Sequence, residues 1–387
     1  MSSALKDKIE KDFISRFQQN PTLFIAPARI NIIGEHVDYN DGFVIPAAID
    51  KYFVFAVRES GNDKCNIFAD DFNEGVTFSI HELNPGEAWV NYLMGMIDAF
   101  QRKGILNGGI DCVFGGNIPA GAGMSSSAAL CCGFGFALNH LFDSRLDRLT
   151  IAVMAQYSEH EFASVNCGIM DQYACLFGEE NSVIHLDCRK LTHEIIKFHP
   201  PDHSILLVDT KIKHSLGTSA YNNRREACEI GLGIVRKKYQ EVFSLRDATR
   251  VMLYEQRDVL GEEIFIKCLF IVEEIARARK AADNIKQKDF AALGDLMYEA
   301  HWGLSQAYEV SCEELDFLVM LAEEDKFAVI GSRMMGGGFG GCTINLIKRD
   351  QEEIFKEKVR QKYFATFKQE PDFYPVQLSK GVHQLKA

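Results

Sequence analysis

Several patterns that would mark a class of protein are missing from this chain of 387 residues. Its eleven cysteines are odd in number and scattered, and they form no C-x-x-C pair. This distribution is typical of reduced thiols, and it excludes a disulfide framework and a cysteine zinc site. The first residues, MSSALKDKIEKDF, contain no apolar segment, so we expect no secretory signal.

The chain also lacks a long hydrophobic run and an excess of positive charge. Its longest apolar run, Ala128–Leu138, is too short to cross a bilayer and suits a buried helix. The formal net charge of −12 argues against nucleic acid or an anionic membrane as a partner. We therefore expect a cytoplasmic protein that binds neither, and that would hold an anionic substrate with local donors and a metal.

Two familiar nucleotide-binding signatures are absent as well. No G-x-x-x-x-G-K-[ST] string occurs, which excludes a P-loop. Neither H-R-D nor D-F-G occurs, which excludes the protein-kinase set.

The order of the expected elements predicts an α+β fold. Apolar residues make up 47% and charged residues 25%, as in ordinary globular proteins, and the length suits two domains. Strands and helices are first interleaved without a regular βαβ rhythm, and the chain is then almost entirely helical from Tyr221 to Glu324. We predict domains 1–200 and 201–387. Helices are expected over 5–19, 87–104, 126–142 and 147–162, and strands over 24–34, 51–60, 65–70, 75–80, 109–119, 182–187, 193–199, 204–210 and 342–348. A last charged helix is expected after the strand 342–348.

A Gly/Ser-rich stretch, NIPAGAGMSSSAAL (117–130), lies between an expected strand and an expected helix. Glycine lets the backbone approach a ligand, and a helix N-terminus attracts negative charge. The stretch therefore suits a phosphate, although by itself it is equally compatible with a turn followed by a helix cap.

A second glycine-rich stretch, GGGFGG (336–341), satisfies G-x-G-x-x-G. It leads into a strand and does not open a helix, so it lacks the context of a dinucleotide site. It is read as a tight turn unless it faces the same ligand as the first loop.

Two further stretches are rich in groups that chemistry could use. APARINIIGEHVDYNDG (26–42) crowds carboxylate, imidazole and amide groups after an apolar strand, which suits a polyhydroxylated ligand as well as a solvated loop. In SEHEFASVNCGIMDQYACLFG, Asp171 has apolar neighbours, and a carboxylate in such company is usually paired or functional.

Taken together, these stretches resemble a known family. GEHVDYNDGFVIP resembles the signature of galactokinases, GAGMSSSAAL resembles their phosphate loop, and SRMMGGGFGGC resembles their C-terminal motif. The resemblance runs from about Phe24 to Asn345, within the wider GHMP small-molecule kinases. It departs from the usual pattern at Met124, Met335 and Gly337, which affects loop packing and nucleotide preference more than the reaction.

The resemblance implies a two-lobed GHMP-kinase fold. The N-terminal lobe would hold a mixed β-sheet, the C-terminal lobe would be helix-rich α+β, and the active site would lie between them. The implied reaction is ATP-dependent phosphorylation of D-galactose at its anomeric hydroxyl to galactose 1-phosphate, the first committed step of galactose catabolism. The implied partners are galactose and Mg·ATP, with Mg²⁺ as cofactor, and we expect a monomer.

The resemblance also assigns roles to individual residues. Asp171 would be the catalytic base, and Arg29 would pair with it and face the moving phosphoryl group. The metal would be held by Ser127 and Glu159. The sugar would be bound by Glu35, His36, Val37, Asp38, Gly168 and Tyr221. ATP would be bound by Gly121, Ala122, Gly123, Met124, Ser125, Ser126, Ser127 and Trp89.

Some alternatives stay open at this point. Trp89 would lie near the adenine or be an ordinary core tryptophan, and the loop from Met334 to Gly341 would lie against nucleotide and sugar. His160, next to Glu159, is expected to make a structural hydrogen bond and not to bind metal. Related activities also fit the motifs, namely an N-acetylgalactosamine kinase or a non-catalytic sensor of galactose and ATP.

Overall fold

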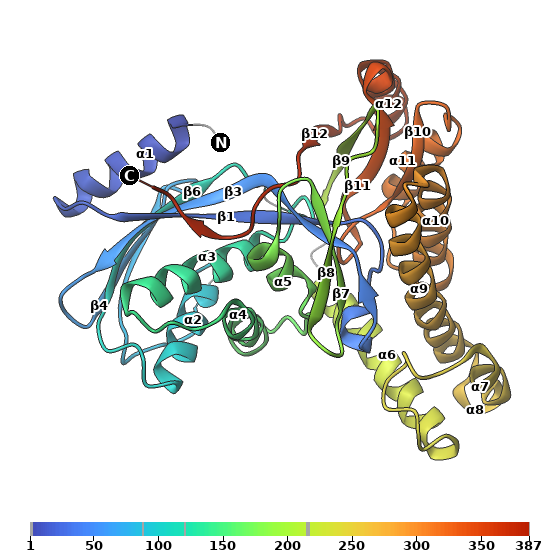
Figure 1. Ribbon diagram of the computed structural model, residues 1–387, viewed down its shortest axis with the longest axis horizontal. Coiled ribbons are helices and arrows are strands. Elements are labelled where there is room, and N and C mark those ends of the chain that lie inside the picture. Colours follow the sequence, from blue (N-terminus) through green and yellow to red (C-terminus); the bar gives the residue numbers. More distant parts are fainter. Residues whose placement is uncertain (1–2, 87–88, 120, 214–216, 387) are drawn as a thin grey trace.

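The structure is a computed structural model that describes residues 3–86, 89–119, 121–213 and 217–386 (Figure 1). A large sheet with helices beneath it forms one end of the molecule, and long helices form the other end. None of the helices described is both long enough and apolar enough to cross a bilayer.

The large sheet has strand order β13-β1-β3-β6-β4-β5, and every pair is antiparallel except β4 with β6. Helix α1 packs on one face through Ile9 and Phe13, and α2 to α5 cover the other face (Figure 1). The strands are β1 (Thr22–Asn31), β3 (Pro46–Glu59), β4 (Lys64–Ala69), β5 (Glu74–Ser79), β6 (Ile110–Gly116) and β13 (His383–Gln384). The helices are α1 (Ser3–Phe17), α2 (Val90–Arg102), α3 (Ser126–Leu141), α4 (Arg148–Ala163) and α5 (Met170–Phe177).

The second half is built on an antiparallel sheet of order β10-β11-β9-β12, and a small sheet β2-β7-β8 lies between the halves (Figure 1). The strands are β2 (Phe43–Val44), β7 (Ser182–Asp187), β8 (Thr192–Lys197), β9 (His203–Lys213), β10 (Val329–Met334), β11 (Gly340–Lys348) and β12 (Asp372–Val376). The helices are α6 (Gly217–Lys238), α7 (Arg250–Glu255), α8 (Arg257–Leu260), α9 (Glu262–Gln287), α10 (Phe290–Trp302), the π-helix η2 (Gly303–Ala307), α11 (Glu313–Glu323) and α12 (Glu352–Phe367).

Helix α3 lies unusually close to the large sheet, and this contact sets the position of the loop before it. A Cβ on Gly133 would lie 2.4 Å from Phe55 Cε2 and 2.6 Å from Ala26 Cβ, so only glycine fits there. The loop end is tied to β1 directly, because Arg29 N donates to the carbonyl of Met124 at 3.2 Å. The Gly/Ser loop is therefore held at the end of β1.

The end of the chain returns to its beginning. Strand β13 pairs with β1, with Phe24 opposite Gln384 and Ile25 opposite His383. The last strand thus belongs to the first sheet, although it follows the C-terminal elements in sequence. The domain boundary near residue 200 stays a prediction.

The helices expected over 5–19, 126–142 and 147–162 are confirmed as α1, α3 and α4, and the expected strands are present. Of the helix expected over 87–104, residues 90–102 form α2, while 87 and 88 lie outside the described residues. Seven elements were not anticipated, namely β2, β10, β12, β13, α5 and the 3₁₀ helices η1 (Asp38–Asn40) and η3 (Arg349–Gln351). Strands β2 and β13 have two residues each, too few for a periodic pattern.

Candidate active site

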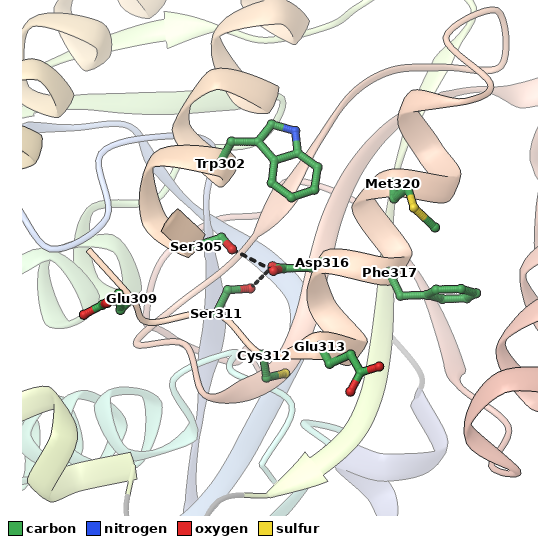
Figure 2. A pocket seen from close by; sticks show the side chains of 9 residues that line it. All are labelled: Trp302, Ser305, Glu309, Ser311, Cys312, Glu313, Asp316, Phe317 and Met320. Atoms are coloured by element: carbon green, nitrogen blue, oxygen red, sulfur yellow. Dashed lines mark hydrogen bonds between the residues drawn. The ribbon is translucent and has the colours of Figure 1, made fainter. Parts of the chain in front are cut away.

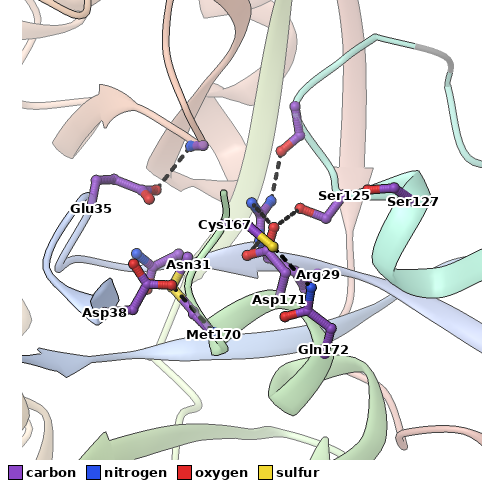
Figure 3. Close-up of polar contacts among 12 residues, drawn as sticks. Arg29, Asn31, Glu35, Asp38, Ser125, Ser127, Cys167, Met170, Asp171 and Gln172 are labelled. Carbon is purple, nitrogen blue, oxygen red and sulfur yellow. Dashed lines mark hydrogen bonds and ion pairs between the residues drawn. The ribbon is translucent and has the colours of Figure 1, made fainter. Parts of the chain in front are cut away.

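Residues of β1, α5, α6 and the loops between other elements meet at one cavity. The space not filled by protein atoms, in the cavity and at its open mouth, is about 340 Å³. Figure 3 shows the polar groups that converge there from β1, the Gly/Ser loop and α5. The cavity is lined by Arg29, Glu35, His36, Asp38, Cys167, Gly168, Met170, Asp171, Tyr221, Gly336 and Gly337.

An ion pair between Arg29 and Asp171 lies at the centre of this site (Figure 3). Arg29 Nε donates to Asp171 Oδ1 at 2.8 Å and Nη2 donates to Oδ2 at 3.0 Å, a two-bond geometry that fixes the carboxylate plane. The Arg29 side chain is 4% exposed, whereas that of Asp171 is 24% exposed. The arginine is therefore a buried support, and the carboxylate faces the cavity.

The charge of Arg29 is stabilised despite its burial. Burial opposes the charge, but Asp171 and Glu35 more than offset it, so the pKa of Arg29 is raised. The third donor, Nη1, bonds the carbonyl of Gly123 at 2.6 Å. One guanidinium thus joins the carboxylate to the Gly/Ser loop.

Ser125 supplies a further donor to the same carboxylate, since its hydroxyl donates to Asp171 Oδ2. The residue has φ 56° and ψ 55°, a left-handed conformation that is costly for serine and is often found at functional sites. The sequence assigned Ser125 to the nucleotide, and its contact with Asp171 was not anticipated.

The two glycine-rich loops pack backbone against backbone. A Cβ on Gly336 would lie 3.2 Å from the carbonyl oxygen of Gly123, and one on Gly341 would lie 3.4 Å from Gly123 N. Both Gly336 and Gly341 have positive φ, 82° and 79°. The loop over 336–341 therefore lies against the Gly/Ser loop and is not an isolated turn.

Glu35 is held by groups from the opposite half of the molecule. Its Oε1 accepts from Gly336 N at 2.9 Å and from Arg333 Nη2 at 3.0 Å. Arg333 is fully buried, and it also donates to the carbonyls of Asn31 and Ile32 at the end of β1. Sequence reasoning missed Arg333, although an arginine within an apolar strand was the available sign.

The carboxylate of Asp38 contacts the N-terminus of α5. This carboxylate accepts from Tyr39 N at 3.0 Å and from Met170 N at 3.3 Å. Burial, together with the negative charge of Asp171, raises the pKa of Asp38 to about 6. A Cβ on Gly168 would lie 1.9 Å from Asp38 Oδ2, so the glycine is what lets the carboxylate approach.

His36 also adopts a left-handed conformation, with φ 61°. Its Nε2 lies 3.2 Å from the carbonyl oxygen of Gly337, and its Nδ1 lies 2.8 Å from the Tyr39 hydroxyl. Burial lowers the pKa of His36 to about 4, although Glu35 nearby opposes the change. The imidazole is thus neutral at pH 7, and both its nitrogens already have protein partners.

Glu159 lies beside the start of α3. It accepts from Ser127 Oγ at 3.2 Å and from Gln172 Nε2 at 2.7 Å. Burial, with Asp171 adding to it, raises the pKa of Glu159 to about 7. In the described residues, His, Cys, Asp and Glu form no group of three or more that could hold a metal. One carboxylate with one hydroxyl nevertheless suits Mg²⁺, which takes few protein ligands when phosphate oxygens supply the others.

The remaining predicted residues differ in position. Tyr221 lines the cavity, with its ring centroid 5.1 Å from that of His36. Val37 is fully buried in the apolar core, so its side chain supports the loop from behind. Trp89 packs edge-on against Phe114 at 5.3 Å, and its role beside adenine stays a prediction.

His160 bonds the carbonyl of Cys167 through Nε2 at 2.8 Å, which confirms the expected structural hydrogen bond. Cys167 and Met170 line the cavity, but sequence reasoning gave them no role. Both lie in the CGIMDQ stretch beside Asp171, which was the available sign.

Comparison with known proteins agrees with this geometry. The galactokinase galactose-binding signature matches residues 11–59, the GHMP kinases N-terminal domain matches 91–179, and the GHMP kinases C-terminal domain matches 281–365. A galactokinase of Thermotoga neapolitana is 37% identical over 360 residues, covering 93% of this chain and 99% of the relative. One of Clostridium acetobutylicum is 36% identical over 385 residues, covering 98% of both.

The chain belongs to the galactokinase family of GHMP kinases. The crystal structure of Lactococcus lactis galactokinase complexed with galactose superposes with a TM-score of 0.94, at 31% identity, covering 98% of this chain and all of that one. A mevalonate kinase structure, at 16% identity and a TM-score of 0.63, shares the fold. The GHMP-kinase fold implied by the sequence motifs is confirmed.

The raised pKa of Glu159 predicts a pH dependence of stability. Its pKa in the folded protein, about 7, exceeds the ordinary value of 4.5, so the protonated side chain favours the folded state. This contribution to the free energy of unfolding is fully present below pH 4.5 and is lost as the pH rises through 7. In Glu159→Gln the side chain stays neutral. We expect the free energy of unfolding to fall between pH 5 and pH 8 by roughly 1–3 kcal/mol less in this variant than in the wild type.

The measurement is urea unfolding at both pH values without nucleotide or metal. Glu161→Gln, at an exposed position on the same helix, is the matched control and should behave as the wild type. The raised pKa of Asp38 gives the same pH dependence of stability to the wild type and to both variants, so it cancels when they are compared. If the free energy of unfolding falls equally between pH 5 and pH 8 in the wild type and in Glu159→Gln, Glu159 is already ionised in the folded protein at pH 5.

Proposed function

We propose that this protein transfers the γ-phosphoryl group of ATP to the anomeric hydroxyl of galactose and forms galactose 1-phosphate. The observation that carries the proposal is the position of Asp171. Its carboxylate is fixed by Arg29 and Ser125 where the polar cavity meets the Gly/Ser loop. A hydroxyl bound in the cavity would face both that carboxylate and a phosphate in the loop.

The sugar half of the site is the cavity itself. Glu35 and Asp38 offer carboxylate oxygens, Tyr221 offers a ring and a hydroxyl, and Gly168 leaves room beside Asp38. A hexose presents hydroxyls that both donate and accept, and acidic side chains accept several such bonds at once. The galactose-binding signature over 11–59, which contains Glu35 and Asp38, supports galactose as the sugar.

The ATP half is the loop from Gly121 to Ser127 at the start of α3. Helix N-termini bind phosphate because free backbone N–H groups and the helix dipole both favour negative charge. Ser126 lies in the first turn, Met124 is buried beneath it, and the loop over 336–341 packs against it. Trp89 would lie near the adenine.

Ser127 and Glu159 would hold Mg²⁺ together with phosphate oxygens. When bound, the ion neutralises charge on the phosphates and helps to orient them. The side chains of Ser127 and Glu159 already contact each other, so they need little rearrangement to share a ligand.

Asp171 would accept the proton of the sugar hydroxyl, and Arg29 would support the carboxylate while facing the transferred group. The two bonds from Arg29 engage both oxygens of this carboxylate, which competes with acceptance of the proton. A loose transition state relaxes this conflict, because the proton need leave only late in phosphoryl transfer. The catalytic contribution of Asp171 then includes orientation of the hydroxyl as well as proton acceptance.

Two other functions share most of these residues. An N-acetylgalactosamine kinase would need a larger cavity on the side of the C2 substituent. A non-catalytic sensor would be expected to be altered at Arg29, Asp171 or the Ser127–Ala128 step, and all of these are intact. We further propose that the protein acts as a monomer in the cytoplasm, where its eleven free cysteines would stay reduced.

Replacing Asp171 tests the chemistry. Asp171→Asn keeps the shape but removes the charge and the proton acceptor, so turnover should fall by at least ~10²-fold, the usual minimum for loss of a general base. The galactose KM should change much less. The matched control is Asp143→Asn, at a residue paired with Arg145 on the exposed surface. If Asp171→Asn keeps more than about a tenth of the turnover, Asp171 is not the base.

Replacing the metal ligands tests the cofactor. Glu159→Gln should raise the Mg²⁺ concentration that gives half-maximal activity, and Ser127→Ala should do so more weakly, because a neutral hydroxyl contributes less than a carboxylate. Galactose KM should stay nearly unchanged, and Glu161→Gln should resemble the wild type. An unaltered Mg²⁺ titration in both variants would move the metal site elsewhere.

A panel of sugars tests the specificity. Glucose differs from galactose only at the C4 hydroxyl, so its kcat/KM should be lower by about 10³-fold or more, since the buried groups that bind that hydroxyl lose their partner. 2-Deoxygalactose should be tolerated better. Asp38→Ala should weaken galactose binding more than ATP binding. Glucose equal to galactose would contradict the specificity, and preference for N-acetylgalactosamine would favour that kinase.

A further inference from the structure

Behind the sugar cavity, four aromatic side chains form a cluster that joins the two halves of the chain. The ring centroid of His36 lies 5.0 Å from that of Tyr308 and 5.1 Å from that of Tyr221, and Tyr39 lies 5.8 Å from Tyr221. His36 and Tyr39 follow β1, whereas Tyr221 belongs to α6 and Tyr308 follows η2. His36 and Tyr221 line the cavity, whereas Tyr39 and Tyr308 lie behind them.

A continuous line of hydrogen bonds runs through this cluster. It starts at Cys228, whose Sγ lies 3.2 Å from the Tyr308 hydroxyl. The Tyr308 hydroxyl lies 2.9 Å from that of Tyr39, which in turn lies 2.8 Å from His36 Nδ1. At the far end, His36 Nε2 lies 3.2 Å from the carbonyl oxygen of Gly337.

The last link fixes the direction of all the others. The Gly337 carbonyl can only accept, so His36 carries a proton on Nε2, and in the neutral imidazole Nδ1 then accepts. Tyr39 then donates to His36, and its oxygen accepts from Tyr308, whose hydroxyl lies closer to Tyr39, at 2.9 Å, than to its other acceptor, the carbonyl of Arg224, at 3.4 Å. With its proton directed to Tyr39, the Tyr308 oxygen accepts from the Cys228 thiol. The low pKa of His36 agrees with this neutral form, because an imidazolium would donate from both nitrogens and reverse the chain.

We propose that Tyr39 and Tyr308 are positioning residues for the sugar site. Through this directional chain they hold His36 as the Nε2–H tautomer, and His36 fastens the C-terminal glycine-rich loop at Gly337 to the wall of the sugar cavity. Tyr308 acts from the C-terminal half and Tyr39 from the N-terminal half, so the chain is a latch between them.

The backbone around Tyr308 is fixed from several directions. Its carbonyl accepts from Arg224 Nε at 2.8 Å, and the carbonyl of Ala307 accepts from the buried Lys267 at 2.7 Å. The Tyr308 side chain itself is fully buried. A phenol held in this way has little freedom, so it can impose an orientation on its partners.

The segment that carries Tyr308, residues 303–312, is also pinned to α11. Ser305 Oγ donates to Asp316 Oδ2 at 2.6 Å, and Ser311 Oγ donates to Asp316 Oδ1 at 2.5 Å (Figure 2). The same segment lines an open pocket, in which the space not filled by protein atoms, including its open mouth, is about 950 Å³. The carboxylate of Asp316 therefore accepts hydrogen bonds from the chain on both sides of Tyr308.

The glycine-rich loop depends on the same segment. Phe339 N donates to the carbonyl of Val310 at 2.7 Å, and a Cβ on Gly338 would lie 2.0 Å from that oxygen. Gly336 N bonds Glu35, and the Gly337 carbonyl bonds His36, so two successive glycines of the loop touch the sugar cavity, and the next, Gly338, lies against Val310. A shift of His36 would therefore be felt where the sugar binds.

Phenylalanine substitutions test the latch, because they remove a hydroxyl and keep the ring. This inference rests on the proposed function, since the assay is galactose phosphorylation. In Tyr39→Phe, His36 Nδ1 loses the Tyr39 hydroxyl as its donor, and we expect the galactose KM to rise roughly 5- to 50-fold. The kcat and the ATP KM should stay within about threefold of the wild type. Tyr308→Phe should raise the galactose KM by a smaller factor, about 2- to 10-fold.

The double variant separates a chain from two independent contacts. Once the Tyr39 hydroxyl is gone, the Tyr308 hydroxyl has no route to His36, so the double variant should have the galactose KM of Tyr39→Phe. Independent roles would instead multiply the two effects. Tyr298→Phe is the matched control, because its buried hydroxyl bonds the carbonyl of Val329 away from the cavity. It should leave both KM values unchanged.

The tautomer of His36 gives a readout that does not need activity. In ¹⁵N-histidine-labelled wild type, with His36→Asn used only to assign the signal, His36 should show the Nε2–H tautomer at pH 7. An Nδ1–H tautomer or an imidazolium would overturn the latch, as would a galactose KM in Tyr39→Phe within about twofold of the wild type. Absence of galactose phosphorylation in the wild type would refute the proposed function and leave the tautomer result intact.

Discussion

The pairing of Arg29 with Asp171 is the interaction on which the rest of the site depends. Arg29 is buried at the end of β1, and its three donor positions reach both carboxylate oxygens of Asp171 and the carbonyl of Gly123. Strand β1, the Gly/Ser loop and the first turn of α5 are thereby all fixed by the planar guanidinium of Arg29. Without the carboxylate, the guanidinium would be left buried and unpaired, which costs several kcal/mol.

The same constraint explains why both glycine-rich loops are needed. The loop at 121–123 must approach Arg29 from one side, and the loop at 336–341 must approach Glu35 and His36 from the other. Side chains at Gly123, Gly336 or Gly341 would crowd the backbone of the facing loop. The site is therefore assembled between the halves of the molecule, and neither half holds it alone.

Much of this could be predicted from the sequence, because the motifs report local chemistry. The expected strand, loop and helix around the Gly/Ser stretch are present, and Asp171 is paired as its apolar neighbours indicated. Contacts between distant segments were not predictable from local pattern. Arg333 reaches Glu35 across 298 residues, and Tyr308 reaches Tyr39 across 269. The short helix α5 also depends on packing that no single stretch reveals.

The central claim is that Asp171 and the phosphate loop converge on the anomeric hydroxyl of the sugar. The most direct test follows the product when galactose labelled with ¹³C at C1 is incubated with Mg·ATP, by ³¹P and ¹³C magnetic resonance. The account predicts ADP together with a sugar phosphate whose phosphorus couples to the labelled C1. Phosphate attached at another carbon, or ADP with free phosphate and unchanged sugar, would contradict it.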